Sequence, residues 1–455
     1  MCGSILPFIR KFLNSTYKAR TVYSFFGKIS RTLVVTVVLI LLGSALQVPV
    51  ARGENRDLIE AGDYLQVLIP AAGLAGTYVA DDPEGRSQFW KTYLSANLIT
   101  TVGKGVYSKL RPRGTARVSF PSGHTTAAFV GAGFIDSRYG HLWGSIAYSA
   151  AALTGYSRID ADAHFADDVL AGASVGLFNT WYWVTPYKST VSLLPMAVKD
   201  GVGVMISVQD PRFVKEEEIL EGKRPRKFRY ELAFGSAFLE KNEITAPESS
   251  GTTFNLADFD KVDDPLTTAQ ATFDWFIADR HTVSIFFWPM EIRDTGTFAQ
   301  PVRFGGEVFP ANVSVASQWR HYKLDVMYMY DLVVDSPWSL RVGGGISGQW
   351  TTIKLNTSNA PVISSAVEDW VVLPLLSLDA GYAITDTWRL QAGATGMYLD
   401  QDKYFSGSLE ARYRFSQRWE GGIGVGNYSR DIETSELREN FSYNTLYLTA
   451  SYTFF

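Results

Sequence analysis

The sequence predicts a multi-domain protein in which an all-α helical bundle is followed by an antiparallel transmembrane β-barrel of about twelve strands. Two observations carry this prediction. Before residue 190, apolar stretches rich in glycine and alanine have helical length; they lie near residues 65–80, 140–157 and 169–185. After Phe228, apolar and polar residues alternate with the period of a strand. A chain of 455 residues has room for two or three domains.

Residues 1–53 form a predicted targeting segment. Basic residues precede an uncharged apolar run from Thr32 to Ala51, and Ala51-Arg52-Gly53 offers small residues for cleavage. The run is nearly as long as a membrane span, so an uncleaved anchor is the alternative. We expect export from the cytoplasm, and Cys2, the only cysteine, would leave with the peptide.

Residues 54–190 form the predicted helical domain. Its apolar stretches are shorter than the roughly 20 residues of a membrane-spanning helix, which favours a packed bundle that touches lipid. The alternative is that these helices cross the inner membrane, but the second half of the chain would then be misplaced. Residues 191–227 are the expected linker. Its basic run, Lys223-Arg224-Pro225-Arg226-Lys227, is expected to be solvated or to touch anionic headgroups.

Residues 228–455 form the predicted barrel. Phe405 and Leu409 share one face of a strand, while Glu410 and Arg412 share the other. The last ten residues resemble the aromatic-ended final strand of bacterial outer-membrane proteins. Tryptophans stand near the expected strand ends, where an interfacial girdle would lie; these are Trp338, Trp388 and Trp419.

The number of strands follows from the spacing of turns. Tight turns and longer polar loops alternate, as they do at the two ends of an outer-membrane barrel. Counting up and down from Phe228, with an extra turn near Pro310, predicts about twelve strands, and ten strands are the second choice. The long loops are expected near residues 244–265, 355–369 and 431–441.

Three segments of the helical domain combine histidines, cations and a carboxylate. They are Lys104-x6-Arg111-Pro112, Pro121-Ser122-Gly123-His124 and Ser157-Arg158-x5-His164-x3-Asp168. Lysine and arginine can neutralise a phosphomonoester where no metal does so. Histidine can attack phosphorus or protonate the departing oxygen near neutral pH. This inventory predicts a phosphoryl-transfer site that needs no metal and no other cofactor.

Local geometry predicts the roles of these residues. If the segment after Ala163 is helical, His164 and Asp168 share a face, so the carboxylate can hold one ring N–H and leave the other nitrogen to attack. A helix start near Gly123 would turn free N–H groups towards phosphate oxygens. His124, at its mouth, would protonate the leaving group. The remaining histidines read as surface or turn residues; they are His141, His281 and His321.

The three segments, in this order, resemble the signature of the type 2 phosphatidic acid phosphatase superfamily, which includes bacterial non-specific acid phosphatases and vanadium haloperoxidases. The resemblance covers roughly residues 57–185, and the run from Asp168 to Gly172, with Gly176 beyond, looks like the closing helix of the family. It implies a phosphohistidine at His164, orientation of that ring by Asp168, and general-acid work by His124. The implied phosphate-binding residues are Lys104, Arg111, Ser122, Gly123 and Arg158.

Together these patterns predict a metal-independent phosphomonoester hydrolase in the outer membrane of a Gram-negative bacterium, with the catalytic domain in the periplasm. A tethered domain meets lipid phosphates at high effective concentration, so a lipid phosphatase surrounded by outer-membrane lipids is favoured. The net charge of -4 offers no basic field for nucleic acid. The alternatives are an outer-membrane channel or structural barrel with an accessory helical domain, and a vanadate-dependent haloperoxidase. The substrate, any conduction by the barrel and the oligomeric state stay open.

Overall fold

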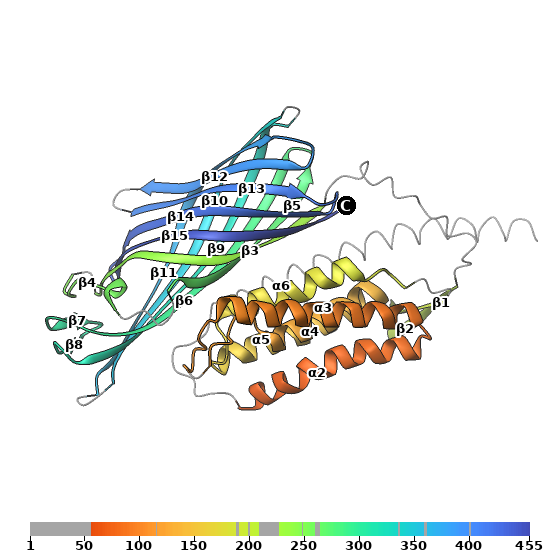
Figure 1. Cartoon of the computed structure of the whole chain (residues 1–455), viewed down its shortest axis with the longest axis horizontal. Coiled ribbons are helices and arrows are strands. Elements are labelled where there is room, and N and C mark those ends of the chain that lie inside the picture. The colour runs from red at the N-terminus through yellow and green to blue at the C-terminus, as the bar shows by residue number, and fades with distance from the viewer. Residues whose placement is uncertain are drawn as a thin grey trace, which may run out of the picture.

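The computed structural model contains a helical bundle and a β-barrel (Figure 1). The structure describes residues 56–114, 116–187, 191–198, 201–208, 227–247, 249–259, 264–334, 337–358, 362–399 and 402–455. The predicted targeting segment, residues 1–53, lies outside the described residues.

Within the described residues, five helices build the bundle. They are α2 (Arg56–Val79), α3 (Pro83–Tyr107), α4 (Gly123–Tyr139), α5 (His141–Asp160) and α6 (Ala166–Trp183). The three stretches predicted as helical correspond to α2, α5 and α6, and the predicted helix start at Gly123 is confirmed. The core is built mainly from small side chains, which lets the helices approach closely; its buried members include Ile69, Ala128, Ala132, Ala147 and Ala151. No helix in the described part of the chain is long and apolar enough to cross a membrane.

Two glycines explain how α6 lies against α4. A Cβ atom at Gly172 would stand 2.5 Å from the backbone oxygen of Ser122, and one at Gly176 would stand 2.9 Å from the backbone nitrogen of Val130. Any larger residue would push the helices apart, because backbone atoms cannot give way as side chains can. The glycines therefore hold the start of α6 close to the start of α4.

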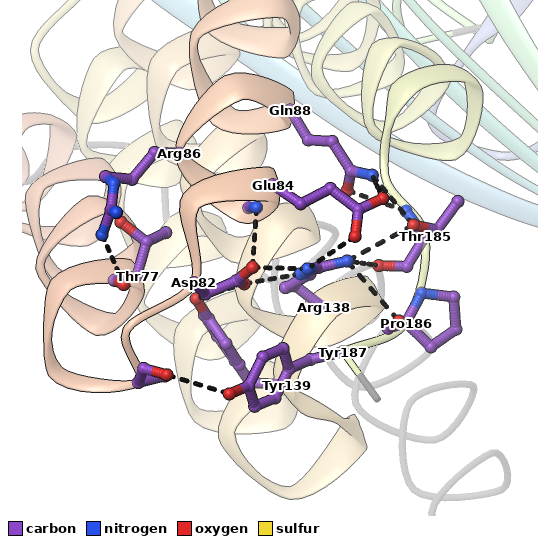
Figure 2. Close-up of polar contacts among 12 residues, drawn as sticks. Thr77, Asp82, Glu84, Arg86, Gln88, Arg138, Tyr139, Thr185, Pro186 and Tyr187 are labelled. Atoms are coloured by element: carbon purple, nitrogen blue, oxygen red, sulfur yellow. Dashed lines mark hydrogen bonds and ion pairs between the residues drawn. The ribbon is translucent and has the colours of Figure 1, made fainter. Parts of the chain in front are cut away.

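A buried polar cluster ties three segments together where α4 ends (Figure 2). The Arg138 guanidinium donates to the Asp82 carboxylate at 2.6 and 2.7 Å, and to the Thr185 carbonyl oxygen at 2.8 Å. Asp82 also accepts from the Gly85 N–H at 2.8 Å and so caps α3. Burial alone would raise the pKa of Asp82, but the hydrogen bonds from Arg138 bring it below its ordinary value. We call these residues the Arg138 cluster.

The predicted linker contains a hairpin. Strands β1 (Val191–Val198) and β2 (Gly201–Val208) pair antiparallel as a separate two-stranded sheet. The sequence analysis expects only a connector over residues 191–227, so this hairpin is an addition. Residues 209–226, which include most of the predicted basic run, lie outside the described part of the chain.

Ten long antiparallel strands close into a barrel, because the last strand pairs with the first. They are β3 (Phe228–Thr245), β5 (Leu266–Ala278), β6 (His281–Thr297), β9 (Ser314–Val333), β10 (Trp338–Thr357), β11 (Ser364–Ala383), β12 (Trp388–Leu399), β13 (Asp402–Arg414), β14 (Trp419–Glu433) and β15 (Arg438–Phe454). The short β4 (Phe254–Asn255) pairs with the end of β3.

The prediction of about twelve strands was wrong, and the second choice of ten is what the structure contains. The turn expected near Pro310 follows a small separate hairpin made by β7 (Val302–Phe304) and β8 (Glu307–Phe309), which adds nothing to the barrel. Two predicted long loops, 355–369 and 431–441, are mostly strand. Several strands have 17 to 20 residues, far more than the 9–11 that a bilayer needs, so their polar ends resemble loops in sequence.

The two ends of the barrel differ. The tight-turn end holds the short connections between β5 and β6, β9 and β10, β11 and β12, and β13 and β14, together with both ends of the barrel segment. The long-loop end holds the longer connections from β3 to β5 and from β6 to β9. The three predicted interfacial tryptophans all begin strands at the tight-turn end, and each packs on a tyrosine of the next strand; the pairs are Trp338–Tyr382, Trp388–Tyr413 and Trp419–Tyr452.

Side chains fill the lumen, and the predicted alternation is confirmed. On β13, Leu409 is 56% exposed on the outer face, whereas Arg412 is buried in the lumen, where its guanidinium donates to Glu231 at 2.5 Å and to Glu410 at 2.6 Å. Towards the long-loop end an apolar cluster takes over, and its largest buried side chains include Trp288, Trp319 and Phe441. A cavity of about 50 Å3 lies within the lumen.

The three histidines outside the motifs have different surroundings. His141 begins α5 and is exposed, and His281 begins β6, as expected for surface or turn residues. His321 is fully buried in the lumen, where its ring stacks on Trp319 and lies 2.8 Å from the Arg430 guanidinium. The prediction for His321 was therefore wrong, because alternation turned it to the filled interior.

The helical bundle flanks the barrel wall, as Figure 1 shows. Near the tight-turn end, Trp181 of α6 stacks on Tyr452 with ring centroids 5.2 Å apart. Leu232 of β3 joins an apolar cluster with residues of α6. Further towards the long-loop end, Arg293 of β6 donates to Asp162 at 2.7 Å. The start of α6 therefore points towards the long-loop end of the barrel.

Candidate active site

Four helix ends meet at the end of the bundle opposite the Arg138 cluster. Lys104 lies in the last turn of α3, Arg158 lies in the last turn of α5, and α4 and α6 begin at Gly123 and Ala166. The 17 residues of α4 separate the two ends by about 25 Å. Helix N-termini carry partial positive charge, so the starts of α4 and α6 favour an anion here. This end carries all of the predicted site residues.

Lys104 and Arg111 form the first pair of cations. The Lys104 ammonium donates to the carbonyl oxygens of Val118 at 2.6 Å and Pro121 at 2.8 Å. Burial and then the nearby Arg111 guanidinium lower the pKa of Lys104 to about 8. The Arg111 Nε is buried and has no acceptor among the described residues. A buried donor without a partner is costly, which fits a group waiting for an anionic ligand.

Arg158 and His124 share one carboxylate. The Arg158 guanidinium donates to the Asp63 carboxylate at 2.6 Å and to the Ile59 carbonyl oxygen at 2.8 Å. The His124 Nε2 lies 3.4 Å from the same Asp63 oxygen. Burial and then the positive charge of Arg158 lower the pKa of His124 to about 4, although Asp63 acts in the opposite direction. Asp63 thus touches the two groups that were predicted to meet phosphate and its leaving oxygen.

His164 and Asp168 lie together, but the helix begins later than predicted. Because α6 starts at Ala166, His164 precedes the helix instead of standing on it. Its Nδ1 lies 3.6 Å from the Asp168 Oδ2, which is longer than a hydrogen bond. Burial lowers the pKa of His164, and Asp168 opposes that shift. Since Nδ1 faces the carboxylate, Nε2 is the nitrogen left for a substrate.

Three donors hold Asp168 in place. Its carboxylate accepts from the Ser119 hydroxyl at 2.5 Å, the Phe165 N–H at 2.9 Å and the Lys109 ammonium at 3.0 Å. Burial alone would raise the pKa of Asp168, but the charge of Lys109 lowers it below its ordinary value. Asp168 is therefore an anion whose direction is set before any substrate arrives.

Lys109 joins two adjacent carboxylates. Besides Asp168, its ammonium donates at 2.8 Å to both oxygens of Asp167, and all three side chains are buried. Burial raises the pKa of Asp167 in spite of this contact. Lys109, Asp167, Ser119 and Asp63 were not among the predicted site residues. For Lys109 and Asp167, the signal in the sequence was a charged residue close to a motif position.

Ser122 and Gly123 differ in what they can offer phosphate. The Ser122 N–H donates to the Asp168 carbonyl oxygen at 2.9 Å, so the prediction that this amide is free was wrong. The Ser122 Oγ accepts from the Thr125 hydroxyl at 2.9 Å, which leaves its own O–H as a donor. Gly123 is the first residue of α4, where a backbone N–H has no intrahelical acceptor. The amide at hand for an anion is therefore that of Gly123.

The charges at this end are unbalanced towards positive. We call Lys104, Arg111, His124, Arg158 and His164 the anion site. The pKa values of Lys104, His124 and His164 are all lowered, and in each case nearby cations contribute to the shift. A bound phosphate group would reverse that repulsion. The arrangement can hold a phosphoryl group between His124, on α4, and His164, which precedes α6.

The family model described as PAP2 superfamily matches residues 87–190. The helical domain belongs to the PAP2 superfamily. This result confirms the resemblance drawn from the three motifs. A lipid A 1-phosphatase of Porphyromonas gingivalis is 39% identical over 161 residues. That match covers 31% of this chain and 36% of the relative, so the chain spans little more than a third of that protein.

Solved structures are similar to parts of the chain. LpxE of Aquifex aeolicus is 22% identical and covers 29% of this chain and 87% of its own, with a TM-score of 0.26. The outer membrane protease OmpT of Escherichia coli is 8% identical and covers 51% of this chain and 100% of its own, with a TM-score of 0.34. The translocator domain of the autotransporter NalP of Neisseria meningitidis is 12% identical, with coverages of 51% and 90% and a TM-score of 0.30.

Proposed function

We propose that this protein is a lipid phosphatase of the outer membrane that removes a phosphomonoester group through a phosphohistidine intermediate. The observation that carries the proposal is the anion site, in which five cationic or basic side chains converge and the buried Arg111 Nε has no acceptor among the described residues. Membership of the helical domain in the PAP2 superfamily and its similarity to a lipid A 1-phosphatase support a phosphatase.

In the proposed reaction the cations hold the phosphoryl oxygens and His164 attacks. The His164 Nε2 forms a bond to phosphorus while the bond from phosphorus to the leaving oxygen breaks, and His124 gives that oxygen a proton. Water then attacks the phosphohistidine, His124 takes a proton from that water, and phosphate leaves. Lys104, Arg111, Arg158 and the Gly123 N–H stabilise the charge of the transition state.

In the proposed reaction Asp168 orients the His164 ring and stays ionised. Its pKa is held below the ordinary value by Lys109, so the carboxylate stays charged beside the ring. A charged neighbour stabilises the extra positive charge that His164 carries as it forms the intermediate. His124 is the proposed proton donor. Burial and then the charge of Arg158 lower its pKa, and a bound phosphate dianion acts in the opposite direction, so that His124 can carry the proton.

A lipid substrate is supported by the surface of α3. Leu94, Leu98, Val102 and Val106 are four residues apart, so they share one helix face, and each is more than half exposed. This apolar stripe runs towards Lys104 in the last turn of the same helix. Acyl chains lying on the stripe would bring a lipid phosphate to the anion site. The relative named lipid A 1-phosphatase makes a phosphorylated glycolipid the favoured member of this class.

The position of the site in the membrane has two candidate answers. The sequence alone predicts a periplasmic catalytic domain, and that placement stays a prediction. The packing of the bundle supports a site near the long-loop end, which faces outwards in outer-membrane barrels. Intact cells that hydrolyse a membrane-impermeant phosphomonoester would support the outward placement, whereas activity seen only after the outer membrane is permeabilised would support the periplasm.

The channel alternative is disfavoured by the filled lumen. Ion pairs around Arg412 and the apolar cluster around Trp319 occupy the interior of the barrel. Conductance measured in lipid bilayers would restore the channel hypothesis. Vanadate-dependent halide oxidation stays as an alternative because vanadate has the shape and charge that the anion site fits. Halogenation that requires added vanadate would favour it.

The test is phosphate release by detergent-solubilised protein from a panel of lipid and soluble phosphomonoesters, with EDTA present. We expect release from lipids by the wild type and none by His164→Ala or Arg158→Ala, while all three proteins form a folded barrel. A fully active His164→Ala protein would contradict the mechanism. Phosphate release that stops on addition of EDTA would show that a metal is needed.

A further inference from the structure

A cavity of about 300 Å3 lies between the helical bundle and the barrel wall. Its lining includes Arg111, Pro112 and Phe165 from the bundle and Glu291, Arg293 and Gln318 from the barrel. Arg111 belongs to the anion site, and Phe165 follows the proposed nucleophile. The cavity therefore adjoins the place where phosphate would bind. Its volume is at the lower end of the range of ligand pockets, about 300–1,000 Å3.

The barrel wall that lines this cavity is polar where a transmembrane barrel is usually apolar. Glu291 accepts hydrogen bonds from Arg293 at 2.6 Å, Gln318 at 2.6 Å and Arg320 at 2.9 Å. Arg293 faces outwards, because it reaches Asp162 of the bundle, and strand alternation puts Glu291 on the same face. Further along β9, the outward side chains are apolar and exposed, as at Val326.

The two arginines of the wall are balanced by one wall carboxylate and one carboxylate of the bundle. Arg293 and Arg320 face Glu291 and, across the interface, Asp162. Such a surface offers hydrogen-bond donors and acceptors without a strong field of one sign, so it suits a neutral group rich in hydroxyls better than a second phosphate. The strong positive charge lies in the adjoining anion site.

We propose that the barrel wall forms part of the substrate site and binds a hydroxyl-rich head group, such as a sugar, that carries the phosphate to be removed. This proposal rests on the proposed phosphatase function. It assigns the barrel a role in recognition: the bundle holds the phosphoryl group, and β6 and β9 hold the alcohol that leaves. The substrate class is thus a phosphorylated glycolipid, selected over a lipid whose phosphate sits on glycerol.

The test compares kcat/KM for a glycosyl-phosphate lipid and for phosphatidic acid with matching acyl chains. We expect the ratio of the two values to fall about tenfold in Arg293→Gln and in Gln318→Ala, as expected for the loss of a hydrogen bond to substrate. Gln318 makes no contact with the bundle among its described hydrogen bonds, so this variant keeps the test valid if Arg293→Gln weakens the interface. Arg438→Gln, an exposed arginine of β15, is the matched control and should keep the wild-type ratio.

The outcomes separate this proposal from the one on which it rests. An unchanged ratio in both variants, or an equal loss on both lipids, overturns the head-group site while leaving the phosphatase intact. A wild-type protein that releases phosphate from no ester overturns the proposed function and the head-group site with it. Folding of each variant is checked by the shift in electrophoretic mobility that an intact barrel shows on heating.

Discussion

Two clusters that contain arginines stand at opposite ends of α4, and they differ in how their charges are neutralised. In the Arg138 cluster, the guanidinium donates to the Asp82 carboxylate and to a carbonyl oxygen, so that the buried charges neutralise each other. In the anion site, the buried Arg111 Nε has no acceptor within the described part of the chain, and burial followed by the charge of Arg158 lowers the pKa of His124.

This difference separates the charges that stabilise the fold from the charges that bind a ligand and serve the reaction. A satisfied buried ion pair resists removal, because deleting one partner strands the other. A cluster of like charges costs stability and is retained at functional sites where a ligand supplies the missing charge. Substitutions at the two ends should therefore have opposite signatures, the first in stability and the second in turnover.

The largest effect on stability is expected at the Arg138 cluster. Arg138→Met leaves the buried Asp82 carboxylate without its cation, so we expect a loss of about 3–5 kcal/mol in the free energy of unfolding of the bundle. The kcat of the protein that stays folded should match the wild type, since no part of the cluster reaches the anion site. Chemical denaturation followed by bundle fluorescence measures the first quantity, and phosphate release at low temperature measures the second. A stable Arg138→Met protein with low kcat would reverse the assignment.

Lys109 combines features of both clusters, because it is a partner in a buried ion pair and also contacts Asp168 of the candidate active site. Lys109→Met leaves Asp167 and Asp168 buried side by side, which should cost about 3 kcal/mol in stability and also disturb His164. Adding Asp167→Asn removes one of the stranded charges, so the double variant should regain most of the stability. Activity should recover only if Asp168 alone can direct His164. Thermal melting and kcat, measured on both variants, check this; no rescue of stability would mean that Lys109 acts by packing.

Arg111 should show the opposite signature to Arg138. Arg111→Met removes a cation whose Nε has no partner among the residues that the structure describes, so we expect the free energy of unfolding to stay the same or to rise. Turnover should fall by about 10²–10³-fold, the loss typical of one donor to a transition-state charge. Denaturation and phosphate-release assays on the same preparation test both parts. A variant that unfolds easily but turns over normally would place Arg111 among the structural residues.

The smallest effect is a proton taken up on binding. Burial and then the charge of Arg158 lower the pKa of His124 to about 4, and a bound phosphate dianion should raise it. When the bound-state pKa is the higher one, binding is strongest at low pH and weakens as pH rises through that value. Calorimetry of phosphate binding near pH 6.5, in buffers of different ionisation enthalpy, should report proton uptake of less than one per site. His124→Asn should take up less; equal uptake in both proteins would contradict the role of His124.

Local motifs were enough to predict which side chains meet at one end of the helical bundle. Lys104, Arg111 and Arg158 meet the two histidines as the spacing predicts, because each motif sits at a helix end and the four helix ends converge. Asp63 could not be predicted: it is a single carboxylate on α2, far from the motifs in sequence, and only packing brings it to Arg158.

The fold was predictable in kind and less so in number. Alternation in β13 revealed both faces of the barrel, since a period of two is unambiguous there. The strand count failed because polar strand ends resemble loops, and because the hairpin of β7 and β8 resembles two further strands. The hydrogen bond from the Ser122 N–H to the main-chain oxygen of Asp168 was not predicted either. The position of that oxygen depends on how α6 packs against α4.

Trapping the phosphohistidine intermediate is the most direct test of the role proposed for His164. Wild-type protein mixed with lipid substrate labelled in the phosphate and quenched with alkali should carry label on one histidine, because a phosphohistidine survives base and is lost in acid. We expect the label on His164 in the wild type and no label in His164→Ala. Label on another residue, or equal labelling of His164→Ala, would contradict the account of this site as a phosphoryl-transfer centre built around His164.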